Sequence, residues 1–140
     1  MGWTLTDILA ATGARAGASA DGYCESICTD SRKLSPGCLF VALVGPHHDG
    51  HNFVAEALNR GAGAALVERL PAGVAPSRVL LVPDTLRALG DLAAFTRRRH
   101  DVRLVAVTGS NGKTTTKEMI ASVCRCASFT PPRTSVLKTA

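Results

Sequence analysis

The sequence predicts an α/β protein, in which a small mixed α/β domain is followed by the first strand, loop and helix of a second, incomplete domain. Two observations predict this fold class. Short apolar runs of strand length alternate with helical patterns as far as about residue 100, which is typical of α/β proteins. The apolar run Leu104 to Val107 then stops at a turn with two glycines and a lysine, and a helical pattern follows.

The composition is that of a globular protein, since 46% of the 140 residues are hydrophobic and 19% are charged. No basic segment precedes a long apolar stretch at the start, and no run reaches the roughly 18 apolar residues of a membrane span. We therefore expect no membrane span and a cytoplasmic location. The five cysteines form no Cys-x-x-Cys pair, which favours buried thiols in a reducing compartment over disulfides or a zinc site.

The net charge of +5 leaves two kinds of partner open. One is nucleic acid, but the basic residues are scattered apart from residues 97–100, which end a predicted helix where positive charge favours the dipole. The other is a small molecule that carries phosphate groups, which is a sufficient explanation. We therefore expect no nucleic-acid partner.

Residues 1–83 are expected to form the first domain. Periodic apolar residues predict helices over 4–11 and over 53–60, and Asn52 can cap the second of them. Short apolar runs predict strands at 26–29, 38–44, 64–68 and 79–82. The stretches between these elements are rich in glycine, proline and polar residues, which favours loops.

A longer helix over residues 84–101 is expected to link two domains. Asp84 fits its N-cap, and leucines recur along it at helical spacing. Residues 102–126 would begin the second domain, and residues 127–140, with a Pro-Pro break and no clear periodicity, would be a tail outside it. One strand and one helix cannot bury their apolar faces alone, so this second domain is expected to be incomplete.

The segment that follows Thr108 has the features of a phosphate-binding loop between a strand and a helix. Gly109 and Gly112 allow a tight turn and a close approach of the backbone to an anion. The first amides of the following helix and the charge of Lys113 would then face a phosphate. Val107 stands where the standard P-loop has its first glycine, so this would be a shortened variant. A glycine turn with a solvated lysine is the alternative.

Each part of this loop has an expected role toward ATP and Mg²⁺. The amides of residues 110–113 would hold the β-phosphate, and Lys113 would neutralise charge toward the γ-phosphate. The hydroxyl of Thr114 or Thr115 would reach the Mg²⁺.

Two polar clusters lie in the first domain. Asp30, Ser31 and Arg32 follow a predicted strand, where an arginine fork suits a diphosphate, although a simple Asx or Ser turn uses the same residues. The second cluster is His-His-Asp-Gly-His at 47–51, whose spacing fits neither a helical nor a finger metal site. It is either a solvated loop or a glycine turn that presents its last histidine to a nucleotide base or sugar. No residue set singles itself out as a Ser-His-Asp triad or paired-carboxylate site.

Four segments in family order resemble the Mur ligases: Thr-Asp-Ser-Arg-Lys-Leu-Ser-Pro-Gly-Cys-Leu-Phe-Val-Ala-Leu (29–43), Asp-Gly-His-Asn-Phe (49–53), Gly-Ala (61–62) and Thr-Gly-Ser-Asn-Gly-Lys-Thr-Thr (108–115). The resemblance covers about residues 4–126. It implies a three-domain cytoplasmic enzyme of peptidoglycan synthesis, whose first domain holds a UDP-sugar and whose second is a P-loop ATPase-like domain. In this family ATP phosphorylates a peptide carboxylate to an acyl phosphate, which an amine attacks to form an amide.

The resemblance also places two groups of residues at the family's sites. The first matches the contacts to the UDP-muramoyl substrate and consists of Asp30, Ser31, Arg32, Gly50 and His51. The second matches the ATP loop and consists of Gly109, Ser110, Asn111, Gly112, Lys113, Thr114 and Thr115. Within it, Lys113 matches the catalytic phosphate-binding lysine, and Thr114 matches the hydroxyl on the Mg²⁺ side.

The amino-acid sequence at residues 33–40 and 117–119 resembles the Mur ligase that joins D-alanyl-D-alanine to UDP-N-acetylmuramoyl-tripeptide, rather than the Mur ligase that adds the third amino acid. Those two molecules are therefore the expected substrates, and a monomer is the expected state. The later family motifs do not follow Cys126, so we expect a truncated or frame-shifted product that is inactive alone. The alternative is a UDP-sugar-binding module that carries a vestigial ATP loop.

Overall fold

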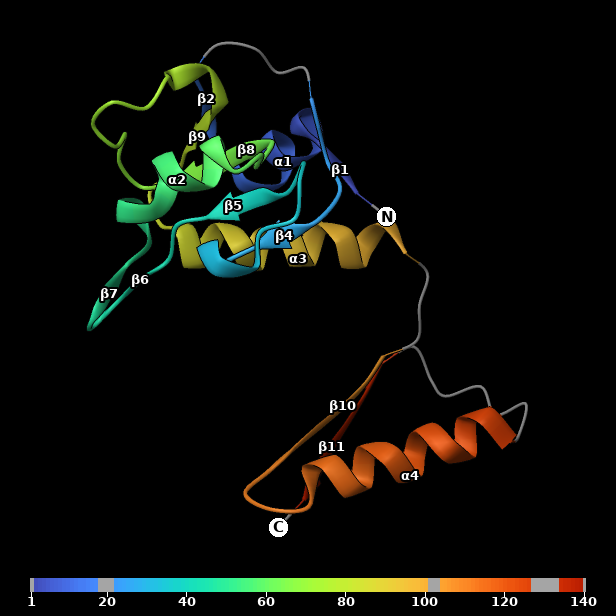
Figure 1. Ribbon diagram of the computed structural model, residues 1–140. Helices are drawn as coiled ribbons and strands as arrows, with labels where there is room; N and C mark the ends of the chain where they lie inside the picture. Colours follow the sequence, from blue (N-terminus) through green and yellow to red (C-terminus); the bar gives the residue numbers. More distant parts are fainter. Residues whose placement is uncertain (1, 18–21, 101–103, 127–133, 140) are drawn as a thin grey trace. The chain divides into compact units, whose positions relative to one another are not determined.

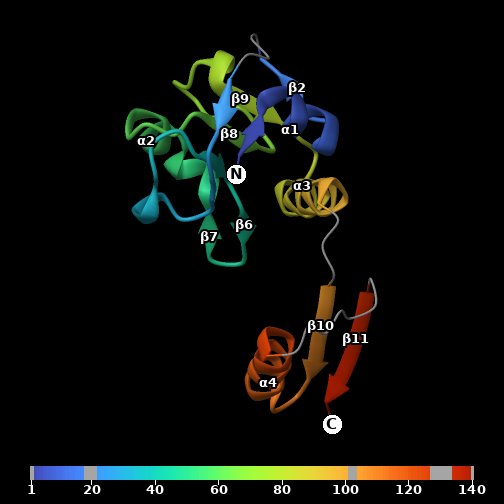
Figure 2. The same ribbon diagram turned by 90° about the vertical axis from the view of Figure 1, so that its right-hand side faces the viewer.

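The computed structural model describes residues 2–17, 22–100, 104–126 and 134–139. The chain divides into two compact units, Met1–Thr96 and Arg97–Ala140. Each unit combines helices and strands, as Figure 1 and Figure 2 show.

The first unit is built on a five-stranded sheet with the order β2-β9-β8-β5-β4. Its strands are β2 (Arg15–Ala16), β4 (Ile27–Cys28), β5 (Leu39–Val41), β8 (Ala64–Val67) and β9 (Val79–Leu81). Strands β4, β5, β8 and β9 run parallel, and β2 pairs antiparallel with β9 at one edge. Every residue of β5 and β8 is buried, which explains their continuous apolar sequence. The expected α/β class is therefore confirmed.

Helices and short turns connect and flank these strands. The helices are α1 (Leu5–Thr12), α2 (Val54–Asn59) and α3 (Thr85–Arg99). The 3₁₀ turns are η1 (Ser31–Lys33), η2 (Gly50–Phe53) and η3 (Pro76–Arg78). Two-residue strands pair as β1 (Trp3–Thr4) with β3 (Tyr23–Cys24), and as β6 (Val44–Gly45) with β7 (His48–Asp49). Helix α1 begins at a capping box between Thr4 and Asp7, which satisfies two amides at its start.

The two faces of the sheet pack into separate cores, and strand β5 contributes to both. Leu39 and Val41 lie in the core that contains α1 and α3 residues. Phe40 lies in the other core, together with Val54 and Ala57 of α2. This follows from the alternation of side chains along a strand. The sheet is therefore the middle layer of the first unit, between α1 and α3 on one face and α2 on the other (Figure 1).

Helix α3, which falls in the expected linker helix over residues 84–101, packs into the core of the first unit. Ala88 and Leu92 are buried in the same core as α1. Near the end of the helix, the indole Nε1 of Trp3 donates a hydrogen bond of 2.8 Å to Thr96 Oγ1. The amphipathic pattern predicted the helix correctly, because its apolar stripe is the surface that packs on the sheet.

The second unit contains β10 (Leu104–Gly109), α4 (Lys113–Cys126) and β11 (Thr134–Thr139). Strand β11 pairs parallel with β10, from Leu104 opposite Thr134 to Gly109 opposite Thr139. No strand was expected here, since residues 127–140 were expected to be a tail with no clear periodicity. The Pro-Pro pair precedes this strand in the sequence and so does not interrupt it, and its Thr and Val residues favour β-structure. The first part of that tail, residues 127–133, and the expected boundary at 101–102 lie outside the described residues.

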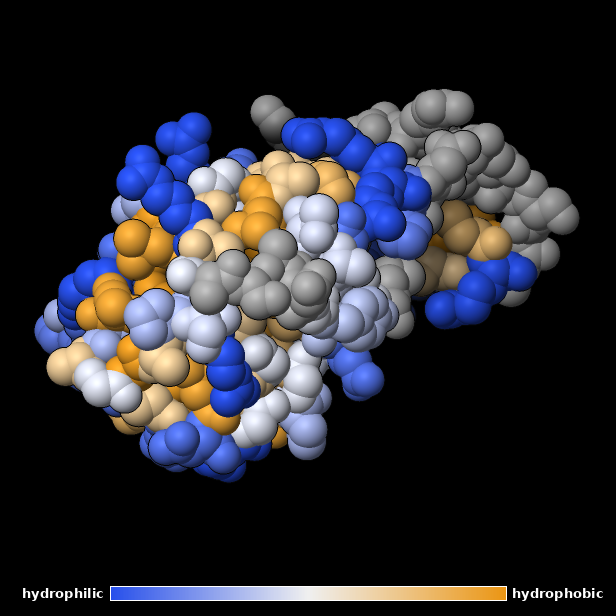
Figure 3. All heavy atoms as spheres, turned by 90° about the horizontal axis from the view of Figure 1, so that it is seen from above, coloured by the Kyte–Doolittle hydropathy of each residue, from blue (hydrophilic) through white to orange (hydrophobic). Residues whose placement is uncertain are grey.

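The surface carries apolar as well as polar side chains. Leu70 is 50% exposed and Leu81 is 37% exposed. On the face of the molecule seen in Figure 3, apolar residues lie between hydrophilic ones. Within the described ranges, no helix combines the length and the apolar content needed to cross a membrane.

Candidate functional site

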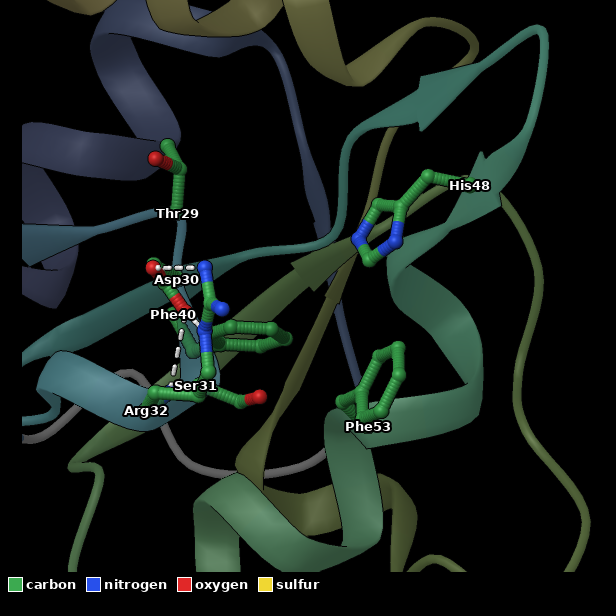
Figure 4. A pocket seen from close by; sticks show the side chains of 7 residues that line it. All are labelled: Thr29, Asp30, Ser31, Arg32, Phe40, His48 and Phe53. Atoms are coloured by element: carbon green, nitrogen blue, oxygen red, sulfur yellow. Dashed lines mark hydrogen bonds and ion pairs between the residues drawn. The ribbon is translucent and has the colours of Figure 1, made fainter.

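A pocket of about 540 Å³ lies near the carboxyl ends of the parallel strands β4 and β5. Ligands of α/β proteins bind at this edge, because the loops that follow parallel strands gather there. The pocket is lined by Thr29, Asp30, Ser31, Arg32, Phe40, His48 and Phe53 (Figure 4). It therefore combines the loop after β4 with the hairpin and turn after β5.

The Asp30 side chain organises the first of these loops. Its Oδ1 accepts hydrogen bonds from the backbone N–H of Arg32 at 3.0 Å and from Arg32 Nε at 2.9 Å. Its Oδ2 accepts a third from Arg32 Nη2 at 2.9 Å, so the pair is bidentate. The Arg32 side chain is 86% exposed. The loop is thus the Asx turn considered from the sequence, and it also holds a cation at the pocket, as Figure 4 shows.

Two further contacts hold this loop from outside the pocket. The guanidinium Nη1 of Arg60 donates a 2.7 Å hydrogen bond to the carbonyl of Ser31, and Glu56 Oε1 accepts from the same nitrogen at 3.2 Å. The Cys28 thiol lies 3.1 Å from the carbonyl of Asp30 and donates to it. No local pattern predicts the Arg60 contact, because the two residues are 29 positions apart.

An aromatic pair forms the opposite wall of the pocket. The rings of His48 and Phe53 are stacked, with centroids 5.4 Å apart and an interplanar angle of 12°. Figure 4 shows both rings across the pocket from Asp30 and Arg32. Neither residue was predicted as a site residue. The available signal was their position, since they flank the Asp-Gly-His motif on either side.

Gly50 and His51 were also expected at this site, but they do not line the pocket. Gly50 is buried, and its N–H donates a 2.8 Å hydrogen bond to the carbonyl of Leu43. His51 is 4% exposed. Its Nδ1 lies 2.7 Å from Asp49 Oδ1, and its Nε2 accepts a 2.9 Å hydrogen bond from the N–H of Glu68. The structure thus brings the Asp-Ser-Arg loop together with two aromatic rings, while Gly50 and His51 are buried outside the pocket lining.

Two carboxylates near the pocket have lowered pKa values. The pKa of Asp30 falls from 3.8 to about 2, chiefly because its side chain accepts hydrogen bonds from the Arg32 side chain. The pKa of Asp49 falls from 3.8 to about 2, chiefly because it accepts from the N–H of His51 and then from the His51 side chain, with a further contribution from Arg69. Both groups are therefore ionised in the folded chain at neutral pH.

These shifts predict a loss of stability in acid. Since both folded pKa values lie below the unfolded value, the stabilisation is complete above about pH 5 and is lost as the pH falls through 3.8 toward about 2. Thermal unfolding followed by circular dichroism should therefore show a midpoint that drops steeply in this window. The double variant Asp30→Asn/Asp49→Asn should show a flatter profile. A double variant whose midpoint falls as steeply as that of the wild type would contradict this assignment.

The second unit contains the predicted phosphate loop. Strand β10 ends at Gly109, and helix α4 begins at Lys113. Gly109 and Gly112 have φ values of 153° and 72°, which L side chains rarely adopt. An added Cβ at Gly112 would meet no atom within 4 Å, so the turn is open. The Lys113 ammonium donates to the carbonyls of Gly109 and Ser110.

The remaining residues of this loop are accessible. Residues 110–115 are all exposed, and they open a helix of 14 residues. A strand that ends in a glycine turn at a helix N-terminus, with a lysine at the first helical position, fits a polyphosphate group. Elsewhere among the described residues, no group of three or more His, Cys, Asp or Glu side chains is placed to hold a metal ion.

Two family models match the chain. The model described as "Mur ligase family, catalytic domain" matches residues 24–97, and the model described as "Mur ligase middle domain" matches residues 107–140. The chain belongs to the Mur ligase family. The second match extends over residues 127–140, which we expected to lie outside the family, and over strand β11. The P-loop-like turn of this Mur ligase chain lies within the same match.

Curated Mur ligases resemble the chain over most of its length. It is 49% identical over 119 residues to the UDP-N-acetylmuramoyl-tripeptide--D-alanyl-D-alanine ligase of Escherichia coli K12, a match that covers 85% of this chain and 25% of the relative. It is 42% identical over 129 residues to the UDP-N-acetylmuramoyl-L-alanyl-D-glutamate--2,6-diaminopimelate ligase of Chlorobaculum tepidum, covering 87% of this chain and 25% of the relative. The chain thus spans about a quarter of the length of these relatives.

Solved structures agree with this assignment. A crystal structure of MurF from Acinetobacter baumannii matches with a TM-score of 0.83 and 32% identity, over 99% of this chain and 36% of that chain. The structure of MurF ligase from Thermotoga maritima in complex with ADP matches with a TM-score of 0.66 and 28% identity, over 81% of this chain and 31% of that chain.

Proposed function

We propose that this chain is the substrate- and ATP-binding part of a ligase that joins D-alanyl-D-alanine to UDP-N-acetylmuramoyl-tripeptide in cytoplasmic peptidoglycan synthesis. The observation that carries the proposal is the pocket in which the Arg32 guanidinium faces the stacked rings of His48 and Phe53. A cation on one wall and flat aromatic rings on the other suit the two halves of a uridine diphosphate group. The relative in Escherichia coli that carries this activity in its name supports the choice of substrates.

The pocket residues would divide the work between diphosphate and nucleoside. Arg32 uses one edge of its guanidinium, Nε and Nη2, to bind Asp30. Its side chain is largely exposed, so the remaining N–H groups can donate to phosphate oxygens. The Ser31 hydroxyl lies in the same lining and would add a donor. Gly50 and His51 would contribute indirectly, since neither lines the pocket.

The loop of the second unit would bind ATP. The amides of Gly109, Ser110, Asn111 and Gly112 would approach the phosphates, and Lys113 would neutralise their charge. Thr114 would place its hydroxyl on Mg²⁺, with Thr115 beside it. When bound, ATP supplies the phosphoryl group that activates the peptide carboxylate. The match to the ADP complex of the Thermotoga maritima enzyme supports this assignment.

One alternative remains within the enzyme class. The Chlorobaculum tepidum relative is named for the addition of 2,6-diaminopimelate, and it matches a similar share of this chain. The two activities differ in the amino component, so amino-substrate dependence of the full-length ligase separates them. We also propose that the 140-residue chain is a monomer without ligase activity. Release of ADP that depends on the tripeptide substrate and D-alanyl-D-alanine would contradict the second point.

Calorimetric titration of the chain tests the proposed pocket. We expect the wild type to bind UDP and the Arg32→Ala variant to bind it about tenfold more weakly, because a charge-assisted hydrogen bond contributes about 1.5–3 kcal/mol. Arg87→Ala is the matched control, since Arg87 is an exposed α3 residue that does not line the pocket. Equal UDP affinity in wild type and Arg32→Ala would contradict the proposal. UDP binding without binding of Mg-ATP would favour a substrate-binding module.

A further inference from the structure

The His51 ring connects the pocket hairpin to the central sheet. On one side, Nδ1 lies 2.7 Å from Asp49 Oδ1, and the backbone N–H of His51 donates to that oxygen at 3.0 Å. On the other side, Nε2 lies 2.9 Å from the N–H of Glu68, the residue that follows β8. A backbone N–H can only donate, so Nε2 accepts and the ring carries its proton on Nδ1. Both nitrogens are therefore used inside the protein.

The partners of this ring are themselves fixed. Asp49 Oδ2 also accepts from Arg69. Glu68 Oε1 accepts a 3.0 Å hydrogen bond from the N–H of Thr85, and Thr85 Oγ1 lies 3.0 Å from both Glu68 Oε1 and the carbonyl of Ala42. Thr85 is 1% exposed. The network thus joins the ends of β5 and β8 to the start of α3, and it gives His51 a rigid attachment.

The segment that the ring holds is the one that carries the aromatic wall. His48 lies just before Asp49, and Phe53 lies two positions after His51. The β6–β7 hairpin has only two residue pairs of its own, Val44 with Asp49 and Gly45 with His48. An isolated pairing of this size is not stable in water. The contact between His51 and Glu68 therefore fixes where the wall stands relative to the sheet.

We propose that His51 is a positioning residue of the UDP pocket, which acts by holding the His48–Phe53 wall against strand β8 and touches no ligand. This inference rests on the proposed function for its ligand. The contacts of His51 with Asp49 and with Glu68 can be removed separately by substitution. An asparagine at 51 can still donate toward Asp49 but is too short to accept from Glu68, whereas a glutamine can reach the Glu68 amide but not pair as the ring does with Asp49.

A double-mutant cycle between His48→Ala and His51→Asn tests the inference by titration with UDP and, separately, with inorganic pyrophosphate. We expect His51→Asn and His51→Gln each to weaken UDP binding about tenfold, a loss comparable to that of one stacking contact, and to leave pyrophosphate affinity unchanged. In the His48→Ala background, His51→Asn should have little further effect. Additive losses would show direct contact with the ligand, and an equal loss for pyrophosphate would show a global effect; either overturns the inference.

A measurement without ligand keeps the inference independent of the proposed function. The ring-to-ring nuclear Overhauser effect between His48 and Phe53 should be present in the wild type and in His100→Asn, the matched control in the second unit. It should be lost in whichever of His51→Asn and His51→Gln retains a folded circular dichroism spectrum. If the wild type fails to bind UDP, the proposed function fails, while this signal still decides the role of His51. A ring-to-ring signal that persists in a folded His51 variant overturns it.

Discussion

Replacing Gly50 with alanine should lower the free energy of unfolding of the first unit by about 1–3 kcal/mol. The added Cβ would meet backbone atoms, and no side chain can move to relieve the overlap. An added Cβ would lie 2.8 Å from the backbone nitrogen of Leu43 and 2.9 Å from two backbone atoms of Ala42. These atoms cannot retreat easily. Ala42 N–H donates a 3.0 Å hydrogen bond to Leu66, and Gly50 N–H itself donates to Leu43.

Urea unfolding followed by the fluorescence of Trp3, the chain's one tryptophan, measures this effect in the first unit. Gly90→Ala is the matched control, because Gly90 lies within α3 and an added Cβ there meets no atom within 4 Å. That variant should be more stable by about 0.5–1 kcal/mol, since alanine is the better helix former. A Gly50→Ala variant as stable as the wild type would show that Gly50 is not confined as described.

Replacing Lys113 with methionine should weaken the binding of Mg-ATP about a hundredfold, because the lysine is expected to make charge-assisted hydrogen bonds to phosphate oxygens. The substitution keeps most of the side-chain volume and removes only the ammonium. Binding of UDP should not change, since every residue that lines its proposed pocket belongs to the first unit.

Calorimetric titration with Mg-ATP provides the measurement. Lys117→Met is the matched control on the same helix, because the Lys117 ammonium pairs with Glu118 at 2.6 Å and lies one turn from the loop. We expect the control to bind Mg-ATP within about twofold of the wild type, as is usual for an exposed ion pair. Unchanged ATP affinity in Lys113→Met would reject the phosphate-loop assignment.

The elements that could be predicted from the sequence are those whose signal is local. Strands β5 and β8 are short, fully apolar runs, and α3 has a regular apolar stripe. Strand β11 was missed because four of its six residues are polar and its partner β10 lies 30 positions earlier. For α3, periodicity shows that the helix has a buried face but not which unit buries it.

The candidate site divides in the same way. The Asp-Ser-Arg loop and the glycine-lysine loop could be predicted because each is contiguous and its chemistry is carried by neighbouring residues. His48, Phe53 and Arg60 reach the pocket or its loop only through tertiary placement. His51 has the residue type of a ligand contact, and only the structure places both of its nitrogens in the interior.

Helix α2 sets the spacing between the two sides of the proposed UDP pocket. Phe53, which precedes the helix, belongs to the aromatic wall, and Arg60, which follows it, holds the carbonyl of Ser31 on the opposite side. The six residues between them span about 9 Å at the helical rise of 1.5 Å per residue. Insertion of one residue would turn one end by about 100° relative to the other. The distance between the two sides of the pocket is therefore set by the number of residues in α2, and repacking of side chains alone cannot change it.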